Sequence, residues 1–143
     1  MVVLDTDVLV AYLRRKDFAV EFIQHLRKAE ETLKTTVFNA AELFKGCYAM
    51  KNVAKGLKKV QALVESLTEV LPFDDRAIQE YAKLAADLKN RGKMIGAFDE
   101  LIGSICVANS ETFYTRNTRH FETIEELKVR NWFEKAQKLN GAF

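Results

Sequence analysis

The chain has 143 residues and a nearly balanced charge, with 22 Lys and Arg residues, 20 Asp and Glu residues and a formal net charge of +2. This length favours one domain with a substantial core, and 48% hydrophobic with 29% charged residues is typical of globular proteins. The composition therefore excludes a disordered chain. It also disfavours a protein that coats nucleic acid through bulk positive charge.

Short apolar runs alternate with longer amphipathic stretches along the chain. The β-branched run at 2–4 is typical of a strand that is buried on both faces of a parallel sheet. The alternation predicts an α/β fold with three α/β/α layers around a mostly parallel sheet. The predicted strands are 2–4, 33–38, 70–71, 112–115 and 127–129, and the predicted helices are 7–13, 18–29, 39–50, 53–66, 76–91 and 98–109.

Several helix ends carry their own signals. Asp7 is predicted to cap the first helix, and Asn39 with Glu42 three residues later fits a capping box. Gly92 suits the position just after the helix that ends at residue 91.

No linker, repeat or low-complexity tract divides the chain. We predict one domain over residues 1–133, followed by a segment at 134–143 whose weak periodicity favours a mobile tail or a short helix. The two cysteines, Cys47 and Cys106, have apolar neighbours and are expected to be buried, reduced thiols.

The sequence favours a cytoplasmic protein with no membrane partner. Asp5 and Asp7 interrupt the opening segment, which therefore lacks the apolar run of a secretory signal. The longest apolar stretch, 101–108, is far shorter than the roughly 18 residues that suggest a bilayer span.

Three acidic residues fall near the carboxyl edge of the predicted sheet. Asp5 follows the first strand, Glu42 lies early in the helix after the second strand, and Asp99 opens an unusually apolar helix. Ligands of open parallel sheets bind at this edge, where the strand order reverses. Each acid alone has an ordinary interpretation as a turn, capping or macrodipole residue. The prediction of a site therefore depends on their convergence.

Converging carboxylates require a cation or protons. Two of them about 4 Å apart repel by roughly 4 kcal/mol at an effective dielectric constant of 20. An oxygen-only set without Cys or His favours Mg²⁺ or Mn²⁺, and such a site suits phosphoryl chemistry. Basic residues near the predicted site are candidates to attract a phosphate backbone, or are solvated surface charges; they are Arg14, Arg15, Lys45, Arg116 and Arg119.

Five segments of the chain occur in an order typical of one family. They are Leu4–Leu9, Asn39–Gly46, Val70–Asp74, Gly96–Ile102 and Thr115–Phe121. With this ordered set the chain resembles PIN-domain ribonucleases, most closely VapC-type toxins of toxin–antitoxin pairs, from residue 2 to about residue 132. The resemblance implies a PIN-like fold and a divalent-metal-dependent endoribonuclease that hydrolyses RNA phosphodiester bonds.

The resemblance also implies roles for individual residues. Asp5, Glu42 and Asp99 match the acidic positions that hold the metal in the family. Thr115 and Asn117 match a Thr-x-Asn/Asp element that orients the metal, its water or the carboxylates. Many relatives have Asp where this chain has Asn117, which adds no negative charge and puts a second metal in doubt.

Two protein partners are implied by the resemblance alone. A small antitoxin would lie across a groove between the early helices, and a homodimer is typical of the family. The residues expected along the groove, which also fit ordinary core packing, are Leu9, Tyr12, Leu13, Leu57 and Val60.

Two other functions compete with this interpretation. Asp5-x-Asp7 after an opening strand is also found in haloacid-dehalogenase-like phosphatases, where the first Asp is the nucleophile. That class needs an acidic pair after a later strand, and the segment from Thr115 reads Thr-Arg-Asn-Thr instead. The second alternative is a non-catalytic PIN-like domain that only binds RNA or protein.

Overall fold

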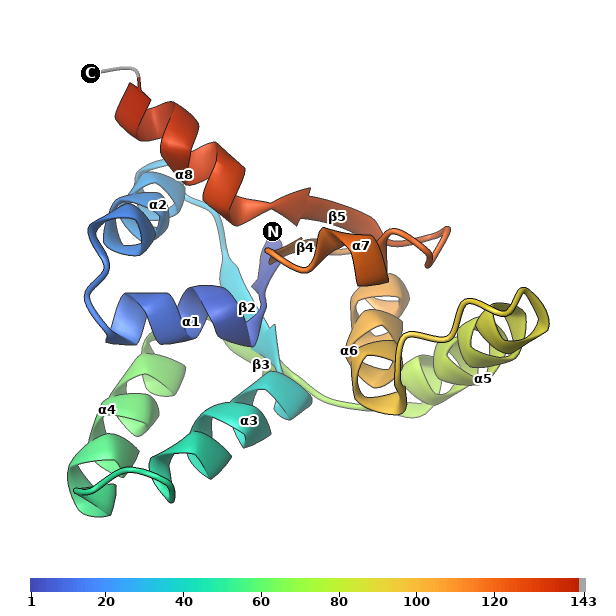
Figure 1. The fold of residues 1–143 in the computed structure, drawn as a ribbon, viewed down its shortest axis with the longest axis horizontal. Coiled ribbons are helices and arrows are strands. Elements are labelled where there is room, and N and C mark those ends of the chain that lie inside the picture. Colours follow the sequence, from blue (N-terminus) through green and yellow to red (C-terminus); the bar gives the residue numbers. More distant parts are fainter. Residues whose placement is uncertain (142–143) are drawn as a thin grey trace.

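The computed structural model describes residues 1–141 and shows a five-stranded parallel sheet with helices on both faces (Figure 1). The strand order is β3-β2-β1-β4-β5, and every neighbouring pair is parallel. The predicted three-layer α/β/α class is confirmed. The strands are β1 (Val2–Leu4), β2 (Leu33–Thr36), β3 (Glu69–Leu71), β4 (Thr112–Thr115) and β5 (Lys128–Asn131).

The helices divide into two groups on either side of the sheet (Figure 1). One core lies under α1, α2, α4 and α8, and the other lies under α5, α6 and α7. The helices are α1 (Thr6–Leu13), α2 (Asp17–Lys28), α3 (Val37–Cys47), α4 (Val53–Ser66), α5 (Asp75–Asn90), α6 (Ala97–Ala108), α7 (Thr118–Phe121) and α8 (Trp132–Gly141).

The central strand β1 shows why its sequence is apolar throughout. Val2 and Leu4 belong to the core under α1 and α2, whereas Val3 belongs to the core under α5 and α6. Successive side chains of a strand point to opposite faces, so a strand covered on both sides needs apolar residues at every position. All three are buried.

The strand order reverses at β1. Its neighbour on one side is β2 and its neighbour on the other side is β4, which follows much later in the chain. The loops that leave the carboxyl ends of β1 and β4 therefore diverge to opposite sides and leave a crevice between them. Asp5 directly follows β1 and Arg116 directly follows β4.

Two predicted helix caps are wrong. The cap of α1 is Asp5 and not Asp7, because the Asp5 carboxylate accepts a hydrogen bond from Thr6 N at 2.8 Å. The cap of α3 is Thr36, whose hydroxyl accepts from Asn39 N at 3.2 Å, so α3 begins at Val37 and Asn39 with Glu42 forms no capping box. In both cases the residue directly before the helix has an extended backbone, and its side chain accepts from a free N–H group of the first turn.

Residues 134–141 of the predicted C-terminal segment belong to helix α8, the second of the two forms predicted, and residues 142–143 lie outside the described residues. Helix α8 packs against α2, and Ala136 is 1% exposed. Phe18 of α2 stacks on Trp132 and meets Phe133 edge to face. The division of the chain at residue 133 stays a prediction.

Other sequence predictions are confirmed. Cys47 and Cys106 are free and buried. Gly92 has a φ of 66° directly after the C-cap of α5, a conformation that favours glycine. Within residues 1–141, the helices are all too short or too polar to cross a bilayer.

Candidate active site

A hollow of about 570 Å³ opens at the carboxyl ends of β1 and β4. We call it the acidic pocket. It contains all three acids that the sequence predicted to converge, together with basic and aromatic side chains. Its lining residues are Asp5, Thr6, Asp7, Val10, Ala11, Arg14, Lys16, Phe18, Glu42, Asp99, Arg116, Asn117 and Trp132.

Asp5 is held on both of its carboxylate oxygens. Asn39 Nδ2 donates to Asp5 Oδ1 at 2.8 Å, and Thr115 Oγ1 donates to Asp5 Oδ2 at 2.7 Å. Asn39 is itself fully buried, and its Oδ1 accepts from Thr36 Oγ1 at 2.7 Å. The ends of three neighbouring strands, β2, β1 and β4, thus fix the orientation of one carboxylate.

The surroundings of Asp5 oppose its negative charge. Burial, followed by repulsion from Asp7, raises the pKa of Asp5 from 3.8 to about 7, with a smaller contribution from Glu42. The hydrogen bonds from Thr115 and Thr6 act in the opposite direction but do not offset burial. A cation next to Asp5 would restore the charged form of this carboxylate.

Asp7 connects α1 to the last third of the chain. Its Oδ2 accepts from Arg116 N at 2.8 Å, and its Oδ1 accepts from Trp132 Nε1 at 3.0 Å. Burial raises the pKa of Asp7, although these hydrogen bonds lower it. Asp7 therefore holds β4 and α8 to α1, which is a different role from the helix cap predicted for it.

Glu42 reaches the acidic pocket from α3. Thr6 Oγ1 donates to Glu42 Oε1 at 2.8 Å, and Asn39 Nδ2 donates to Thr6 Oγ1 at 3.0 Å. Because α3 begins at Val37, Glu42 lies in its second turn, where its side chain is free to face Thr6 instead of capping the helix.

Asp99 lies in the first turn of α6, as predicted, and its side chain is 30% exposed. Its Oδ2 lies 3.3 Å from His120 Nδ1, and Asn117 Nδ2 lies 3.0 Å from the same ring nitrogen. Asn117 and Asp99 thus meet at one ring nitrogen of His120, which either accepts from Asn117 or donates to Asp99. The neighbouring Glu100 is buried and accepts from Ile95 N, so it has a structural role.

The donor set fits a hard divalent cation, but the side chains are not arranged as a complete ligand cage. Within residues 1–141, no group of three or more His, Cys, Asp or Glu side chains is placed to hold a metal ion. Glu42 is hydrogen-bonded to Thr6, and Asp99 to His120. Mg²⁺ commonly takes one or two carboxylates and keeps several waters. Asp5 and one further acid are therefore enough to coordinate Mg²⁺ directly, with water as the other ligands.

The predicted basic residues are distributed unevenly around the acidic pocket. Arg14 and Arg116 line it, whereas Arg15, Lys45 and Arg119 lie outside its lining. All five are exposed.

Several contributors to the site were absent from the sequence prediction, among them Thr6 and Asn39, which hydrogen-bond to the acids. Lys16, Phe18 and Trp132 line the acidic pocket, and His120 contacts Asp99. The apolar residues have the pattern of core positions, and only the arrangement of α2 and α8 places them at the pocket. His120 was visible in the Thr115–Phe121 segment, but a lone histidine carries no signal of its partner.

The fold and the pocket together define a class: an α/β protein with carboxylates gathered where the order of a parallel sheet reverses. The PIN domain family matches residues 2–127. The chain belongs to the PIN domain family, as its motifs indicated.

Similar proteins within this family are VapC ribonucleases. The chain is 32% identical to VapC ribonuclease Y4jK of Sinorhizobium fredii, over 85% of this chain and 91% of that protein. It is 23% identical to the tRNA(fMet)-specific endonuclease VapC of Shigella flexneri, over 90% of this chain and 96% of that one. In the crystal structure of VapBC2 from Rickettsia felis bound to a promoter DNA fragment, a chain 26% identical superposes with a TM-score of 0.84, covering 92% of this chain and 99% of that one.

Proposed function

We propose that this chain is a metal-dependent endoribonuclease and the toxin of a VapBC-type toxin–antitoxin pair. The observation that carries the proposal is the meeting of Asp5, Glu42 and Asp99 in one pocket at the point where the strand order reverses. The names of its relatives, ribonucleases and toxin–antitoxin complexes, support the same activity.

In this proposal Asp5, Glu42 and Asp99 are the candidate ligands of one Mg²⁺ or Mn²⁺, of which one or two are enough for direct coordination. The cation, when bound, neutralises charge on the RNA phosphate and makes water a better nucleophile. Thr115 and Asn39 hold Asp5 in one orientation from opposite sides. Asn117, a neutral residue, lies next to Asp99, and both contact His120 Nδ1. A single cation is consistent with the absence of a fourth carboxylate at Asn117.

The decisive experiment compares two Asp-to-Asn variants of the full chain. Asp99→Asn is expected to lower the rate of RNA cleavage by roughly 100-fold or more, because removing one preorganised electrostatic contact at a reacting centre typically costs this much. The matched control is Asp75→Asn, an exposed acid at the start of α5 outside the acidic pocket, which is expected to cleave at the wild-type rate. Cleavage of a labelled RNA in Mg²⁺ is the measurement.

Full activity of Asp99→Asn would contradict the assignment of the site. Calorimetric titration with Mg²⁺ and Mn²⁺ separates the remaining alternatives, because a domain that only binds RNA or protein needs no divalent site. Hydrolysis of a small phosphomonoester would favour the haloacid-dehalogenase alternative. The residues after β4, Arg116 and Asn117, do not supply the acidic pair which that alternative requires.

An antitoxin has a suitable surface between α1, α2 and α4. Two further hollows, of about 800 and 510 Å³, share Leu13, Arg15 and Lys59 in their linings. Of the residues predicted along this groove, Tyr12, Leu13 and Val60 line the hollows, whereas Leu9 and Leu57 do not. Core packing, the other interpretation of these residues, applies to Leu9 and Val60, which are 1% and 5% exposed. We propose that an antitoxin segment occupies these hollows, and a small open reading frame beside the gene would be its source.

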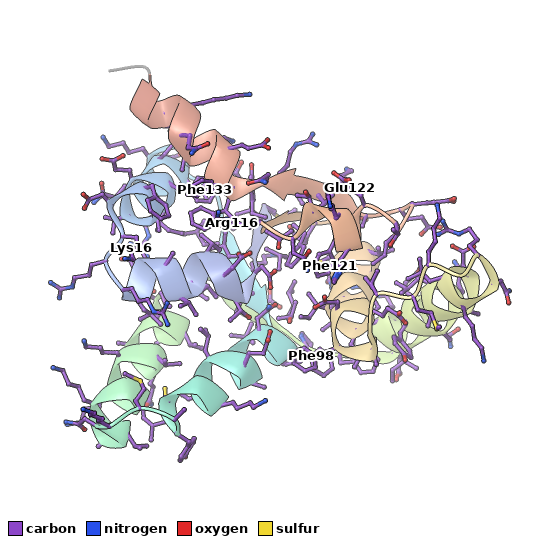
Figure 2. All side chains as sticks on the ribbon, in the orientation of Figure 1. Lys16, Phe98, Arg116, Phe121, Glu122 and Phe133 are labelled. Atoms are coloured by element: carbon purple, nitrogen blue, oxygen red, sulfur yellow. The ribbon has the colours of Figure 1, made fainter. Side chains whose placement is uncertain are left out.

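A homodimer is proposed through a second surface, at the start of α6. Phe38, Phe73, Tyr81 and Phe98 form a chain of ring contacts that we call the aromatic cluster. Phe98, labelled in Figure 2, is 40% exposed, and a partly exposed aromatic group of this kind is typical of protein interfaces. With RNA as the substrate, the expected location of the protein is the cytoplasm.

A further inference from the structure

The acidic pocket has a second part that the proposed cation site does not use. Helix α1 starts beside Asp5 and runs along the pocket to Arg14, a distance of roughly 13 Å at 1.5 Å per residue. Beyond Asp5, Glu42 and Asp99, the lining holds one further carboxylate, Asp7, whose two oxygens accept from Arg116 N and Trp132 Nε1. The rest of this part consists of Val10, Ala11, Arg14, Lys16, Phe18, Arg116 and Trp132.

Arg116 and three aromatic rings form an ordered platform in this part. The Arg116 guanidinium carbon lies 3.9 Å from the centre of the Phe133 ring. Phe133 meets Phe18 edge to face at 5.1 Å, and Phe18 stacks on Trp132 at 5.8 Å with an interplanar angle of 25°. Figure 2 shows Arg116 and Phe133 together between α1 and the start of α8, with Lys16 at the far end of α1. We call Arg116 and the three rings that support it, Phe133, Phe18 and Trp132, the stacking platform. Trp132 is 1% exposed, so the face that a base can reach is the exposed Arg116 side chain.

Asp7 holds the stacking platform in place before any ligand arrives. One of its carboxylate oxygens accepts from the Arg116 backbone N–H at 2.8 Å, and the other accepts from the Trp132 indole at 3.0 Å. The Arg116 side chain remains exposed, although its backbone and its ring partner are both fixed. An exposed guanidinium backed by an aromatic ring is a preorganised planar surface.

We propose that the stacking platform binds one unpaired nucleobase of the RNA, next to the phosphodiester that is cut. This inference rests on the proposed ribonuclease function. Protein sites read single-stranded RNA by stacking bases on aromatic rings or Arg guanidinium planes. Lys16 and Arg14, on the same side of the pocket, are suited to a phosphate of that nucleotide.

The charge distribution gives the bound nucleotide one orientation. Asp5, Glu42 and Asp99 repel phosphate unless a cation is present, whereas the platform side carries three basic residues, Arg14, Lys16 and Arg116, against one carboxylate, Asp7. A base that is paired in a duplex has both faces covered by its neighbours and cannot reach the platform. The chemical class of ligand is therefore a ribonucleotide with a free base.

The test uses the full-length chain, labelled with ¹⁵N, and 5′-GMP as the probe. Trp132 is the single tryptophan of the chain, so its indole N–H gives one resolved signal from within the stacking platform. Titration with 5′-GMP without divalent cations is expected to shift this signal. Ribose 5-phosphate, which lacks the base, is expected to bind at least about five-fold more weakly, since one stacked base is worth that much or more.

Two substitutions of the same residue separate stacking from charge. Arg116→Lys keeps the positive charge but removes the guanidinium plane, and it is expected to bind 5′-GMP no better than ribose 5-phosphate. Arg116→Ala is expected to weaken both probes. The matched control is Arg130→Ala, an exposed arginine of β5 outside the acidic pocket, which is expected to bind 5′-GMP like the wild type.

The proposal is overturned if 5′-GMP and ribose 5-phosphate bind equally to the wild type, or if Arg116→Lys retains the preference for 5′-GMP. Both measurements are made without metal and without cleavage. They therefore succeed or fail independently of the Asp99→Asn result, which tests the ribonuclease function itself.

Discussion

At the scale of a single residue, the environment of Asp5 suits the binding of a cation but lowers the stability of the folded protein without one. Its carboxylate is buried, and Asp7 and Glu42 both repel its charge. Three hydrogen bonds, from Thr6 N, Asn39 and Thr115, hold the group in place but leave its pKa at about 7. The charged form of Asp5, which a cation requires, is therefore the form that its protein surroundings alone disfavour.

The Asp5→Asn variant should show this conflict directly. A carboxyl group with a folded-state pKa near 7 and an ordinary value of 3.8 takes up a proton on folding, so the stability of the wild type falls as the pH rises between these values. Asn carries no charge at any pH. Without metal we expect Asp5→Asn to be more stable than the wild type at pH 8, by on the order of 2–4 kcal/mol, and to differ little near pH 4.

Thermal or urea unfolding in a chelator at both pH values measures the effect. Thr115 Oγ1 lies 3.3 Å from Asp7 Oδ2 and can turn its proton there, so Asn at position 5 leaves no unpaired donor. An Asp5→Asn variant that is less stable than the wild type at pH 8 would show that the hydrogen bonds outweigh the repulsion. Asp75→Asn again serves as the control.

At the scale of elements, α3 and α6 each contain a glycine, in opposite surroundings. A Cβ built at Gly46 of α3 meets no atom within 4 Å, whereas a Cβ at Gly103 of α6 lies 2.6 Å from Ile124 Cδ1. Ile124 is buried with Phe121 and Leu127 between α6 and the sheet edge. Gly46 therefore has no packing role, whereas Gly103 allows the Ile124 side chain to lie close to the backbone of α6.

Alanine at the two positions should change stability in different directions. We expect Gly46→Ala to stabilise the protein by about 0.5–1 kcal/mol, through loss of backbone freedom in the unfolded chain. Gly103→Ala gains the same term but has to displace Ile124, at a cost of roughly 1–3 kcal/mol. Urea denaturation of both variants measures the difference, and equal effects would mean that Ile124 can move away freely.

At the scale of the whole molecule, the aromatic cluster predicts an assembly. We expect the wild type to sediment as a dimer and Phe98→Ser to shift toward monomer, because the substitution removes the exposed ring that would be buried between copies. Tyr48→Ser is the control, since Tyr48 is 70% exposed at the end of α3 and belongs to no ring pair in the described residues. A monomeric wild type at micromolar concentration would contradict the proposed dimer.

The sequence predicted the elements well where local signals were strong. The apolar run of β1 and the periodic stripe of α4 appear as expected, because burial on both faces or on one stripe leaves a direct pattern. It failed at the starts of α1 and α3. There several side chains could cap the helix. The caps are Asp5 and Thr36, the residues with extended backbone directly before each helix.

The sequence by itself determined the α/β class, the family and the three acids at strand or helix ends, because these depend on residue type and local spacing. Only the tertiary structure decided what surrounds them. More than a hundred residues of sequence separate Asp7 from both Arg116 and Trp132. The parallel sheet and helix α8 bring these residues together. A local pattern cannot specify partners that are distant in the chain, and in this protein such partners hold the Asp5 carboxylate through Asn39 and Thr115 and build the stacking platform.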